Sequence, residues 1–299
     1  MRPAQRITPI RSRDNAQYKR LRRLAQDNTQ YRREGAVWVE GDHLCRAALG
    51  RGHMPALAVF SEEFWSRPSA EWSGLATEII VLPAALMAGL SALESPAPVA
   101  FVLKLPPAAA LQAHAPSVVL DRVQDAGNVG SILRSAAAFG FRQVLALKGT
   151  AALWSPKVLR AGMGAHFGLQ LHEGLAAADL DGLRVPLVAT SSHEGEFLHR
   201  RAPPFPCALV MGHEGQGVDA TLMARAATLV RIAQPGGEES LNVAAAVAGK
   251  PSVNLNYTAG RANLAAAARQ AGLTHALTSR AFLEKAKLDL PEDLALVYL

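Results

Sequence analysis

The sequence predicts an α/β fold built on parallel sheet, with helices covering both faces. Short apolar runs rich in Val, Leu and Ile alternate along the chain with longer segments of helical pattern, which is typical of parallel sheets. Polar, glycine-rich segments directly follow several of these runs, and in such sheets ligands bind at the carboxyl ends of the strands. A chain of 299 residues, 49% hydrophobic and 19% charged, has room for one large or two ordinary domains.

The first unit is expected to be a small α/β domain at residues 1–105. A helix capped by Ser12 or Asp14 is predicted to run to about Tyr31. Its apolar face is expected to consist of Tyr18, Leu21, Leu24 and Ala25. The remaining elements are predicted in this order: strand 37–39, helix 44–49, and strands 56–60, 78–82 and 99–103.

A second unit, expected at residues 117–248, follows a linker rich in proline and alanine at 106–116. Its strands are predicted at 118–120, 144–147, 187–190, 208–211 and 229–232, and its helices at 132–139, 157–166 and 222–227. The polar segments that follow strands are 121–130, 190–194, 212–217 and 234–240. Because the carboxyl ends of parallel strands meet at one edge of a sheet, we expect these segments to form one site.

All of the excess positive charge lies at the N-terminus. Residues 1–35 hold ten Lys or Arg residues and three acidic residues, although the net charge of the whole chain is only +6. This pattern indicates either a solvated helix face or a surface that binds nucleic-acid phosphates, with Tyr18 and Tyr31 as stacking faces for bases. The candidate nucleic-acid contacts are Arg11, Arg13, Lys19, Arg22 and Arg23.

The cysteines and the apolar runs exclude several classes of protein. Cys45 and Cys207 lie far apart, which argues against a disulfide scaffold and indicates a reducing compartment, the cytoplasm. Both are expected to be buried small hydrophobic residues. No apolar run is long enough to cross a membrane, and the basic N-terminus lacks the hydrophobic region of a secretory signal. The nine histidines show no metal-ligand spacing, so no metal is predicted.

Three segments of the second unit carry the candidate chemistry. Residues 120–140 read LDRVQDAGNVGSILRSAAAFG, in which two glycines are expected to form a tight loop ahead of Arg134. Residues 209–218 read LVMGHEGQGV and hold one carboxylate, Glu214. Residues 229–248 read LVRIAQPGGEESLNVAAAVA, a strand, glycine turn and helix start that make either a ligand cradle or a plain structural connection. None of the three matches a P-loop or the GxGxxG dinucleotide fingerprint.

Taken in this order, the three segments resemble the motifs of the SpoU–TrmH group of the SPOUT superfamily. Members of that group are S-adenosylmethionine-dependent RNA 2′-O-ribose methyltransferases, are dimeric, and form a deep trefoil knot, a rare exception to the rule against threaded chains. The resemblance therefore implies a knotted methyltransferase domain with S-adenosylmethionine as cofactor, no metal, RNA as partner and a homodimer with its active site near the interface. The N-terminal unit is similar to the substrate-binding domain of rRNA-methylating members, which favours rRNA as the substrate, with tRNA as the alternative.

The resemblance also implies roles for individual residues. The methyl donor would be held mostly by backbone, at Thr190, Gly212, Gly217, Ile232 and Leu241. The expected catalytic residues are Arg134, Asn128, Glu214, Ser240 and Asn242. Arg134 would lie beside the target ribose and stabilise the developing alkoxide.

The other four have roles with open alternatives. Asn128 would position Arg134 or the target phosphate, and Glu214 would orient Arg134 or hold the loop. Ser240 and Asn242 would contact RNA or fix the cradle. For each of these residues the alternative is a purely structural role in a cap or loop.

Two departures from the family pattern stand out. Gly162 occupies a position where family members more often carry serine, and the helix that begins near Ser240 meets Pro251, which would break it. Residues 249–299 resemble a fragment of an AMP-forming acyl-CoA or acyl-ACP synthetase without its ATP loop. We interpret this tail as a fusion remnant or gene-model artefact, with a strand, helix and strand at 253–256, 264–271 and 276–278.

The departures leave two alternatives to an active methyltransferase. One is an RNA-binding protein that kept the fold but lost turnover, because its last helix is cut short. The other is a piece of an adenylate-forming ligase, against which the missing ATP loop argues. Measured methyl transfer to RNA separates the first alternative from an active enzyme.

Overall fold

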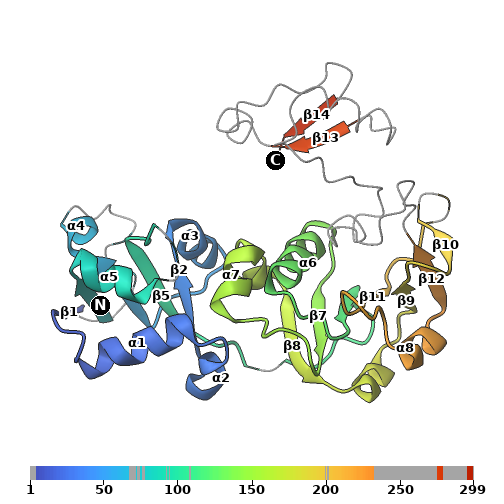
Figure 1. Cartoon of the computed structure of the whole chain (residues 1–299), viewed down its shortest axis with the longest axis horizontal. Coiled ribbons are helices and arrows are strands. Elements are labelled where there is room, and N and C mark those ends of the chain that lie inside the picture. The colour runs from blue at the N-terminus through green and yellow to red at the C-terminus, as the bar shows by residue number, and fades with distance from the viewer. Residues whose placement is uncertain are drawn as a thin grey trace.

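The computed structural model describes residues 5–66, 72, 75, 78–91, 93, 95–107, 109–198, 200, 202–231, 275–278 and 295–298. Within these residues the chain forms two helix-covered sheets side by side and a separate pair of strands (Figure 1). The α/β class predicted from the sequence is confirmed, and the larger sheet is parallel throughout its paired strands.

The N-terminal sheet has five strands in the order β1-β4-β3-β5-β2. Its strands are β1 (Arg6–Pro9), β2 (Ala36–Glu40), β3 (Leu57–Ser61), β4 (Glu78–Leu82) and β5 (Val99–Lys104). The strands β1, β4 and β3 are parallel, whereas β5 runs antiparallel to both β3 and β2. Four of the five were predicted, and β1 was missed because its short sequence, RITP, carries no apolar alternation.

The first predicted helix is wrong at both ends. It begins one residue after Asn15, whose side chain accepts hydrogen bonds from the backbone of Gln17 and Tyr18, so neither Ser12 nor Asp14 is the cap. It also ends early, because the Asp27 carboxylate binds the backbone and hydroxyl of Thr29 and turns the chain. The result is two helices, α1 (Ala16–Gln26) and α2 (Gln30–Glu34).

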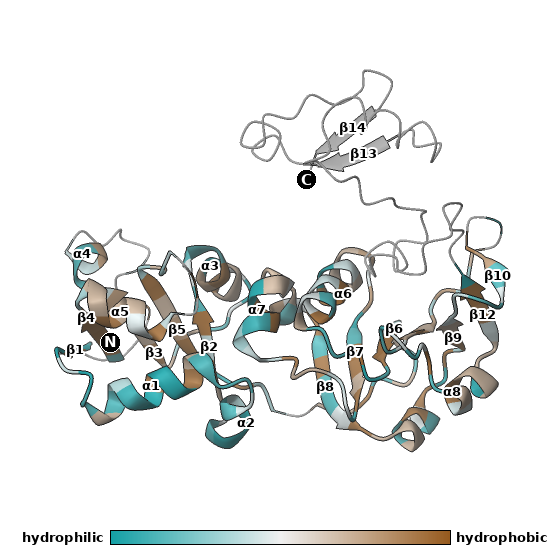
Figure 2. Cartoon of the chain, in the orientation of Figure 1, coloured by the Kyte–Doolittle hydropathy of each residue, from teal (hydrophilic) through white to brown (hydrophobic). Residues whose placement is uncertain are grey.

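The face of α1 that packs on the sheet is the one that the sequence predicted. Tyr18, Leu21, Leu24 and Ala25 are all buried, while the other faces of α1 are hydrophilic (Figure 2). Tyr18 and Tyr31, however, are each only 2% exposed, so the proposal that they stack on bases is wrong. The other helices of this half are α3 (Asp42–Gly50), α4 (Glu62–Trp65) and α5 (Ala84–Leu90).

The second sheet has seven strands in the order β10-β12-β9-β11-β6-β7-β8. They are β6 (Ser117–Leu120), β7 (Gln143–Leu147), β8 (Gln170–Leu175), β9 (Leu187–Thr190), β10 (Glu196–Phe197), β11 (Ala208–Met211) and β12 (Thr228–Arg231). The predictions for β6, β7, β9, β11 and β12 are confirmed within one residue at each end. The strands β8 and β10 were missed because β8 mixes polar and apolar residues without a clean period and β10 has only two residues.

Alternate residues of the central strands face two different layers of helix. Val118 and Leu120 of β6 belong to the core cluster that also contains Ile132 and Val158, whereas Val119 belongs to a second cluster with Leu222. The first face is covered by α6 (Ala126–Ala138) and α7 (Pro156–Gly162), and the second by α8 (Ala220–Arg225) and the 3-10 helix η2 (Ala177–Gly182) (Figure 1). This double covering explains the continuous apolar character of the strands.

The helix α6 begins six residues earlier than predicted. Residues 121–130 were expected to be a loop, but the Asp125 side chain accepts a hydrogen bond from the backbone of Asn128 and starts the helix at Ala126. Gly130 therefore lies inside a helix, where a Cβ atom would overlap Ala161 of α7. This glycine permits close packing of two helices rather than a tight loop.

The helix α7 is shorter than the predicted segment 157–166. It ends at Gly162, because Met163 and Gly164 both adopt left-handed backbone conformations, with φ of 48° and 88°. The chain then forms a short 3-10 helix, η1 (Ala165–Gly168). In the last helix of this half, α8, the predicted segment 222–227 begins two residues too late and ends two residues too late.

The two halves share one core. A single cluster of buried side chains contains Trp38 of β2 and Val158 of α7, and these two elements are in contact across the boundary. Close to this contact, a Cβ atom on Gly164 would lie 2.7 Å from the Cβ of Ala47 in α3. The two halves are therefore packed directly against each other through α7, β2 and α3, in addition to the covalent connection between β5 and β6.

Only two short strands are described in the C-terminal tail. They are β13 (His275–Thr278) and β14 (Ala295–Tyr298), which pair in parallel. The predicted strand 276–278 is thus confirmed. The predicted elements at 253–256 and 264–271 lie outside the described residues, and the likeness of the tail to a synthetase fragment stays a prediction.

Candidate functional site

The loops that follow neighbouring strands of the larger sheet meet at one edge, as predicted. Because β12, β9, β11 and β6 are adjacent and parallel, their carboxyl ends lie together. Three of the predicted polar segments, 121–130, 190–194 and 212–217, follow these strands. The fourth, 234–240, lies outside the described residues, as do Ile232, Ser240, Leu241 and Asn242.

The carboxylate of Glu214 connects the loops that follow β6 and β11. It accepts hydrogen bonds from the backbone N–H groups of Gln124 (3.1 Å) and Asp125 (3.0 Å) and from the side-chain amide of Asn128 (3.2 Å). Of the two roles considered for Glu214, the structure therefore supports holding the loop. Asn128 is likewise engaged with Glu214 and not with Arg134.

The same contacts determine the charge state of Glu214. Partial burial favours the neutral acid, but the N–H donors of Asp125 and Gln124, together with the Asn128 amide, outweigh it and lower the pKa of Glu214. The ionised carboxylate accepts stronger hydrogen bonds than the neutral acid would. The start of α6 is thus held by a charged acceptor over the pH range in which proteins usually function.

Arg134 lies on the solvent-exposed face of α6, away from this anchor. The helix buries Val129, Ile132 and Leu133, which leaves Asn128, Ser131 and Arg134 at successive spacings of three residues on its outer side. Six residues of helix separate Asn128 from Arg134, a rise of about 9 Å. Among the described residues no hydrogen bond or ion pair involves the Arg134 guanidinium. Its five donors are therefore available to a ligand within this part of the structure.

The glycine-rich loop after β11 is closed on itself. The backbone groups of His213 and Gly217 exchange two hydrogen bonds (3.0 and 2.8 Å), and the His213 Nδ1 atom accepts from the N–H groups of Gly215 and Gln216. A Cβ atom on Gly212 would overlap the backbone of Gly217. Gly212 is thus required for the closed shape of the loop, and the His213 ring stabilises that shape.

The described donor-binding candidates present main chain rather than large side chains. Thr190 ends β9, and its hydroxyl donates to the backbone carbonyl of Val210 at 3.0 Å, so the hydroxyl proton is already used. At Gly217, whose φ is 70°, a Cβ atom would meet nothing within 4 Å. Small residues and open space beside two adjacent strand ends fit a ligand that is held by backbone contacts.

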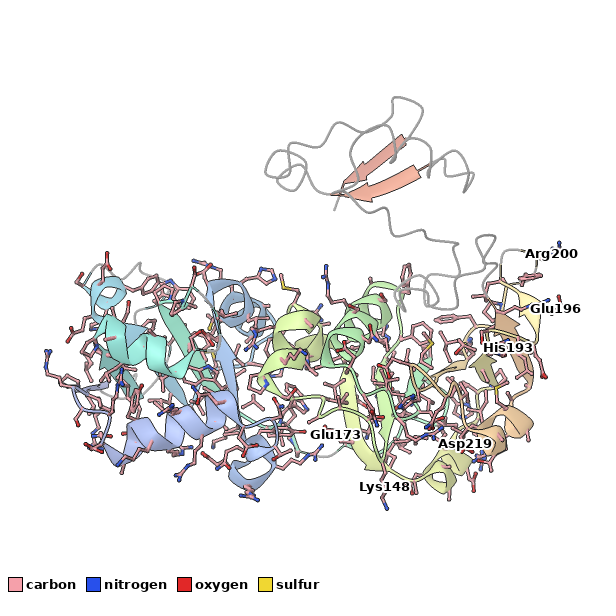
Figure 3. The ribbon with its side chains drawn as sticks, viewed as in Figure 1. Lys148, Glu173, His193, Glu196, Arg200 and Asp219 are labelled. Atoms are coloured by element: carbon pink, nitrogen blue, oxygen red, sulfur yellow. The ribbon has the colours of Figure 1, made fainter. Side chains whose placement is uncertain are left out.

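Two charged residues of this edge were not predicted as site residues. Asp121 is only 3% exposed, and its carboxylate accepts two hydrogen bonds from the neighbouring Arg122 (2.9 and 3.1 Å) and one from the backbone of Asp219 (2.7 Å). Asp219 is labelled in Figure 3. The sequence feature that could have identified them is an Asp-Arg pair directly after a buried strand. A carboxylate at such a position is expected to be buried, and a buried charge needs a partner of opposite charge.

The predicted nucleic-acid contacts are solvent-exposed. Arg11 pairs with Glu62 at 2.9 Å, Lys19 with Asp14 at 3.0 Å, and the Nε atom of Arg22 donates to Gln26. Arg13 and Arg23 are exposed as well. Surface ion pairs of this kind are weak, so phosphates can displace the acidic partners.

The departure at Gly162 has a structural explanation. A Cβ atom there would lie 2.8 Å from the Nδ1 atom of His166, whose ring is buried against Trp154. The Nε2 atom of His166 lies 2.8 Å from the carbonyl of Leu153, and burial lowers the pKa of His166 to about 4. A neutral histidine ring thus occupies the space that a larger residue at 162 would need.

Three other expectations concern cysteine, metal and membrane. Cys45 and Cys207 are both free and buried, as predicted, and burial raises the pKa of each thiol. In the part of the chain that the structure describes, no cluster of His, Cys, Asp and Glu is able to hold a metal ion. None of the helices described is long and apolar enough to span a membrane.

Comparison with known proteins agrees with this geometry. Residues 115–248 match the model of the SpoU rRNA Methylase family. The chain is 30% identical over 214 residues to the 23S rRNA (guanosine(2553)-2′-O)-methyltransferase RlmP of Bacillus subtilis, a match that covers 70% of this chain and 84% of that protein. It is 40% identical over 157 residues to the mitochondrial rRNA methyltransferase 3A of Danio rerio, but spans only 36% of that longer relative.

Solved structures show the same architecture over most of the chain. One is the crystal structure of an RNA 2′-O ribose methyltransferase, with a TM-score of 0.67 and 27% identity, which covers 81% of this chain and 95% of that one. An AdoMet-bound rRNA methyltransferase from Sinorhizobium meliloti has a TM-score of 0.70 with 88% and 98% coverage, and at 24% identity it supports the fold. The chain therefore belongs to the SpoU rRNA methylase family of S-adenosylmethionine-dependent RNA methyltransferases.

Proposed function

We propose that this chain transfers the methyl group of S-adenosylmethionine to a ribose 2′-hydroxyl of ribosomal RNA. The observation that carries the proposal is the position of Arg134. Its guanidinium is exposed on α6, and the start of that helix is held by Glu214 from the glycine-rich loop after β11. A helix that is anchored at the donor-binding edge of the sheet thereby presents an exposed cation to the ribose oxygen.

The residues divide the chemistry between them. The donor, when bound, supplies a methyl group on a sulfonium centre, which needs no metal. In the transfer, the ribose oxygen would form a bond to the methyl carbon, the carbon–sulfur bond would break, and the hydroxyl proton would pass to water. Arg134 stabilises the negative charge that develops on the ribose oxygen, because a guanidinium offers hydrogen-bond donors and has no acceptor atom. Asn128 and Glu214 keep α6 in place, and neither touches Arg134.

The donor pocket is assigned to the loops after β9 and β11. Thr190, Gly212 and Gly217 are the described members, and their small size fits a donor held by main chain. Ile232 and Leu241 are proposed as its apolar walls and Ser240 and Asn242 as RNA contacts, all outside the described residues. The proposed trefoil knot also requires that segment, because the knot forms when it threads through a loop.

The remaining parts of the proposal concern RNA, assembly and location. Two relatives named above are rRNA methyltransferases, and the exposed basic face of α1 would contact RNA phosphates.

A homodimer is supported by the exposed aromatic side chains of Phe139 (47%) and Phe205 (62%) near the end of α6. Two free, buried cysteines fit the reducing cytoplasm.

Substitution of Arg134 tests the function. Arg134→Ala should lower methyl transfer to rRNA by a factor on the order of a hundred to a thousand, while donor affinity stays at the wild-type level. Arg134→Lys is the matched control. It keeps the positive charge but lacks the planar guanidinium group, and should retain partial activity. The readouts are transfer of label from S-adenosylmethionine to rRNA and calorimetric donor binding. Wild-type transfer rates in Arg134→Ala would refute the role of Arg134.

A further inference from the structure

Arg122 is held in an unusual conformation at the carboxyl end of β6. Its φ is 58°, in the left-handed region that a non-glycine residue adopts only at a cost. Its side chain is 32% exposed, yet the guanidinium is fixed by a two-pronged contact with the buried carboxylate of Asp121. A glycine or asparagine would suit this backbone better, so the arginine side chain is the feature that needs an explanation.

The side chain of Arg122 connects the loops after three adjacent strands. The aliphatic part of the Arg122 side chain packs on Gly149 in the loop after β7. A Cβ atom added to Gly149 would lie 3.1 Å from the Cγ atom of Arg122. Its Nη1 atom donates to the side-chain oxygen of Gln216 at 3.1 Å, in the loop after β11. The Asp121 carboxylate that orients it also accepts from the backbone of Asp219, the residue that caps α8. The strands β11, β6 and β7 are neighbours in the sheet.

Gln216 lies in the glycine-rich loop, next to one of the proposed donor-binding residues. Its backbone N–H donates to the His213 Nδ1 atom, and it directly precedes Gly217. Gln216 therefore takes part in two contacts: its side chain accepts a hydrogen bond from Arg122, and its backbone N–H donates to the His213 ring. The loop shape depends on both contacts.

We propose that Arg122, oriented by Asp121, is a positioning residue that holds the 212–217 loop in its donor-binding shape through Gln216. This inference rests on the proposed function, since it takes that loop as part of the S-adenosylmethionine pocket. Arg122 acts on the donor through the loop. The reaction chemistry stays with Arg134.

The most specific test removes only the hydrogen bond between Arg122 and Gln216. Gln216→Ala leaves the Arg122–Asp121 pair intact and should weaken S-adenosylmethionine binding about fivefold to tenfold, because one charge-assisted hydrogen bond is lost. Gln216→Glu keeps an acceptor in place and should restore wild-type affinity. The maximal rate at saturating donor should change little in either variant, so that the loss falls on KM for the donor and not on kcat.

Arg122→Lys provides the second arm. A lysine keeps a charge beside Asp121 but cannot bind Asp121 and Gln216 in the same geometry, so donor affinity should fall as in Gln216→Ala. If Arg122 served only to neutralise Asp121 and cap α8, Gln216→Ala would leave donor affinity unchanged, and this result would overturn the inference. A wild-type chain that binds no S-adenosylmethionine would instead refute the proposed function, whatever the variants do.

Discussion

The phenolic oxygen of Tyr31 lies 2.7 Å from both carboxylate oxygens of Glu173, across the boundary between the two sheets (Figure 3). Tyr31 belongs to α2, and Glu173 belongs to β8. The same carboxylate accepts from Arg32 at 3.0 Å and from the backbone of Leu153 at 2.7 Å. Burial, followed by the nearby Glu173 charge, raises the pKa of Tyr31, so the phenol stays a proton donor. Glu173 is thus a hydrogen-bonded connection between the two halves.

Removing either partner of this pair should destabilise the chain. We expect Tyr31→Phe and Glu173→Gln each to lower the free energy of unfolding by about 1–3 kcal/mol, because each removes a hydrogen bond between the buried phenol and an ionised carboxylate. Urea denaturation of both variants and of the double variant measures the coupling between them. Strictly additive losses would contradict a direct interaction between the two side chains.

The Glu214 anchor should be sensitive to the number of hydrogen bonds that residue 214 can accept. Glu214→Ala loses all three contacts to Gln124, Asp125 and Asn128, and should reduce methyl transfer on the order of a hundredfold, as removal of a key positioning group does in other enzymes. Glu214→Gln keeps an oxygen acceptor without the charge and should lie in between. Because the pKa of Glu214 is lowered, wild-type transfer should lose this contribution only as the pH falls through that lowered value. Single-turnover transfer assays across acid pH provide the measurement.

Buried His166 should make stability depend on pH in a defined window. Its pKa is about 4 in the folded chain and 6.5 when exposed, so the unfolded state binds the extra proton between these values. The contribution of the neutral His166 ring to the free energy of unfolding is fully present above pH 6.5. It decreases by about 3 kcal/mol as the pH falls to 4. His166→Gln, which cannot titrate, should show a shallower decline in denaturation midpoints over this window. The background from His172, whose pKa is also lowered, is common to both proteins.

Close packing of α6 on α7 should make residue 130 intolerant of a side chain. Gly130→Ala places a methyl group against Ala161 and should cost about 1–3 kcal/mol of stability, since both backbones must move apart. Ser131→Ala, on the solvent-facing side of the same helix, is the control and should leave the melting temperature almost unchanged. Equal melting temperatures for the two variants would contradict the tight helix contact.

The sequence by itself determined the class of fold and most of the strands. The runs at 118–120, 144–147 and 208–211 are apolar throughout because both faces of their sheet are covered, and such local patterns need no knowledge of the partners. The family motifs likewise marked Arg134, Asn128 and Glu214 as candidate site residues. The strands β1 and β8 escaped prediction because they are defined by pairing to distant strands and not by their own period.

The tertiary structure alone decided how these residues are used. Glu214 binds the start of α6 and not Arg134, because the loops after β6 and β11 become neighbours only when their strands pair. Tyr31 is buried against Glu173 and is not a face for stacking bases, because a residue 142 positions along the chain reaches it in the fold. Contacts of this range depend on how sheets and helices pack, and local sequence patterns record the faces of each element but not which element each face meets.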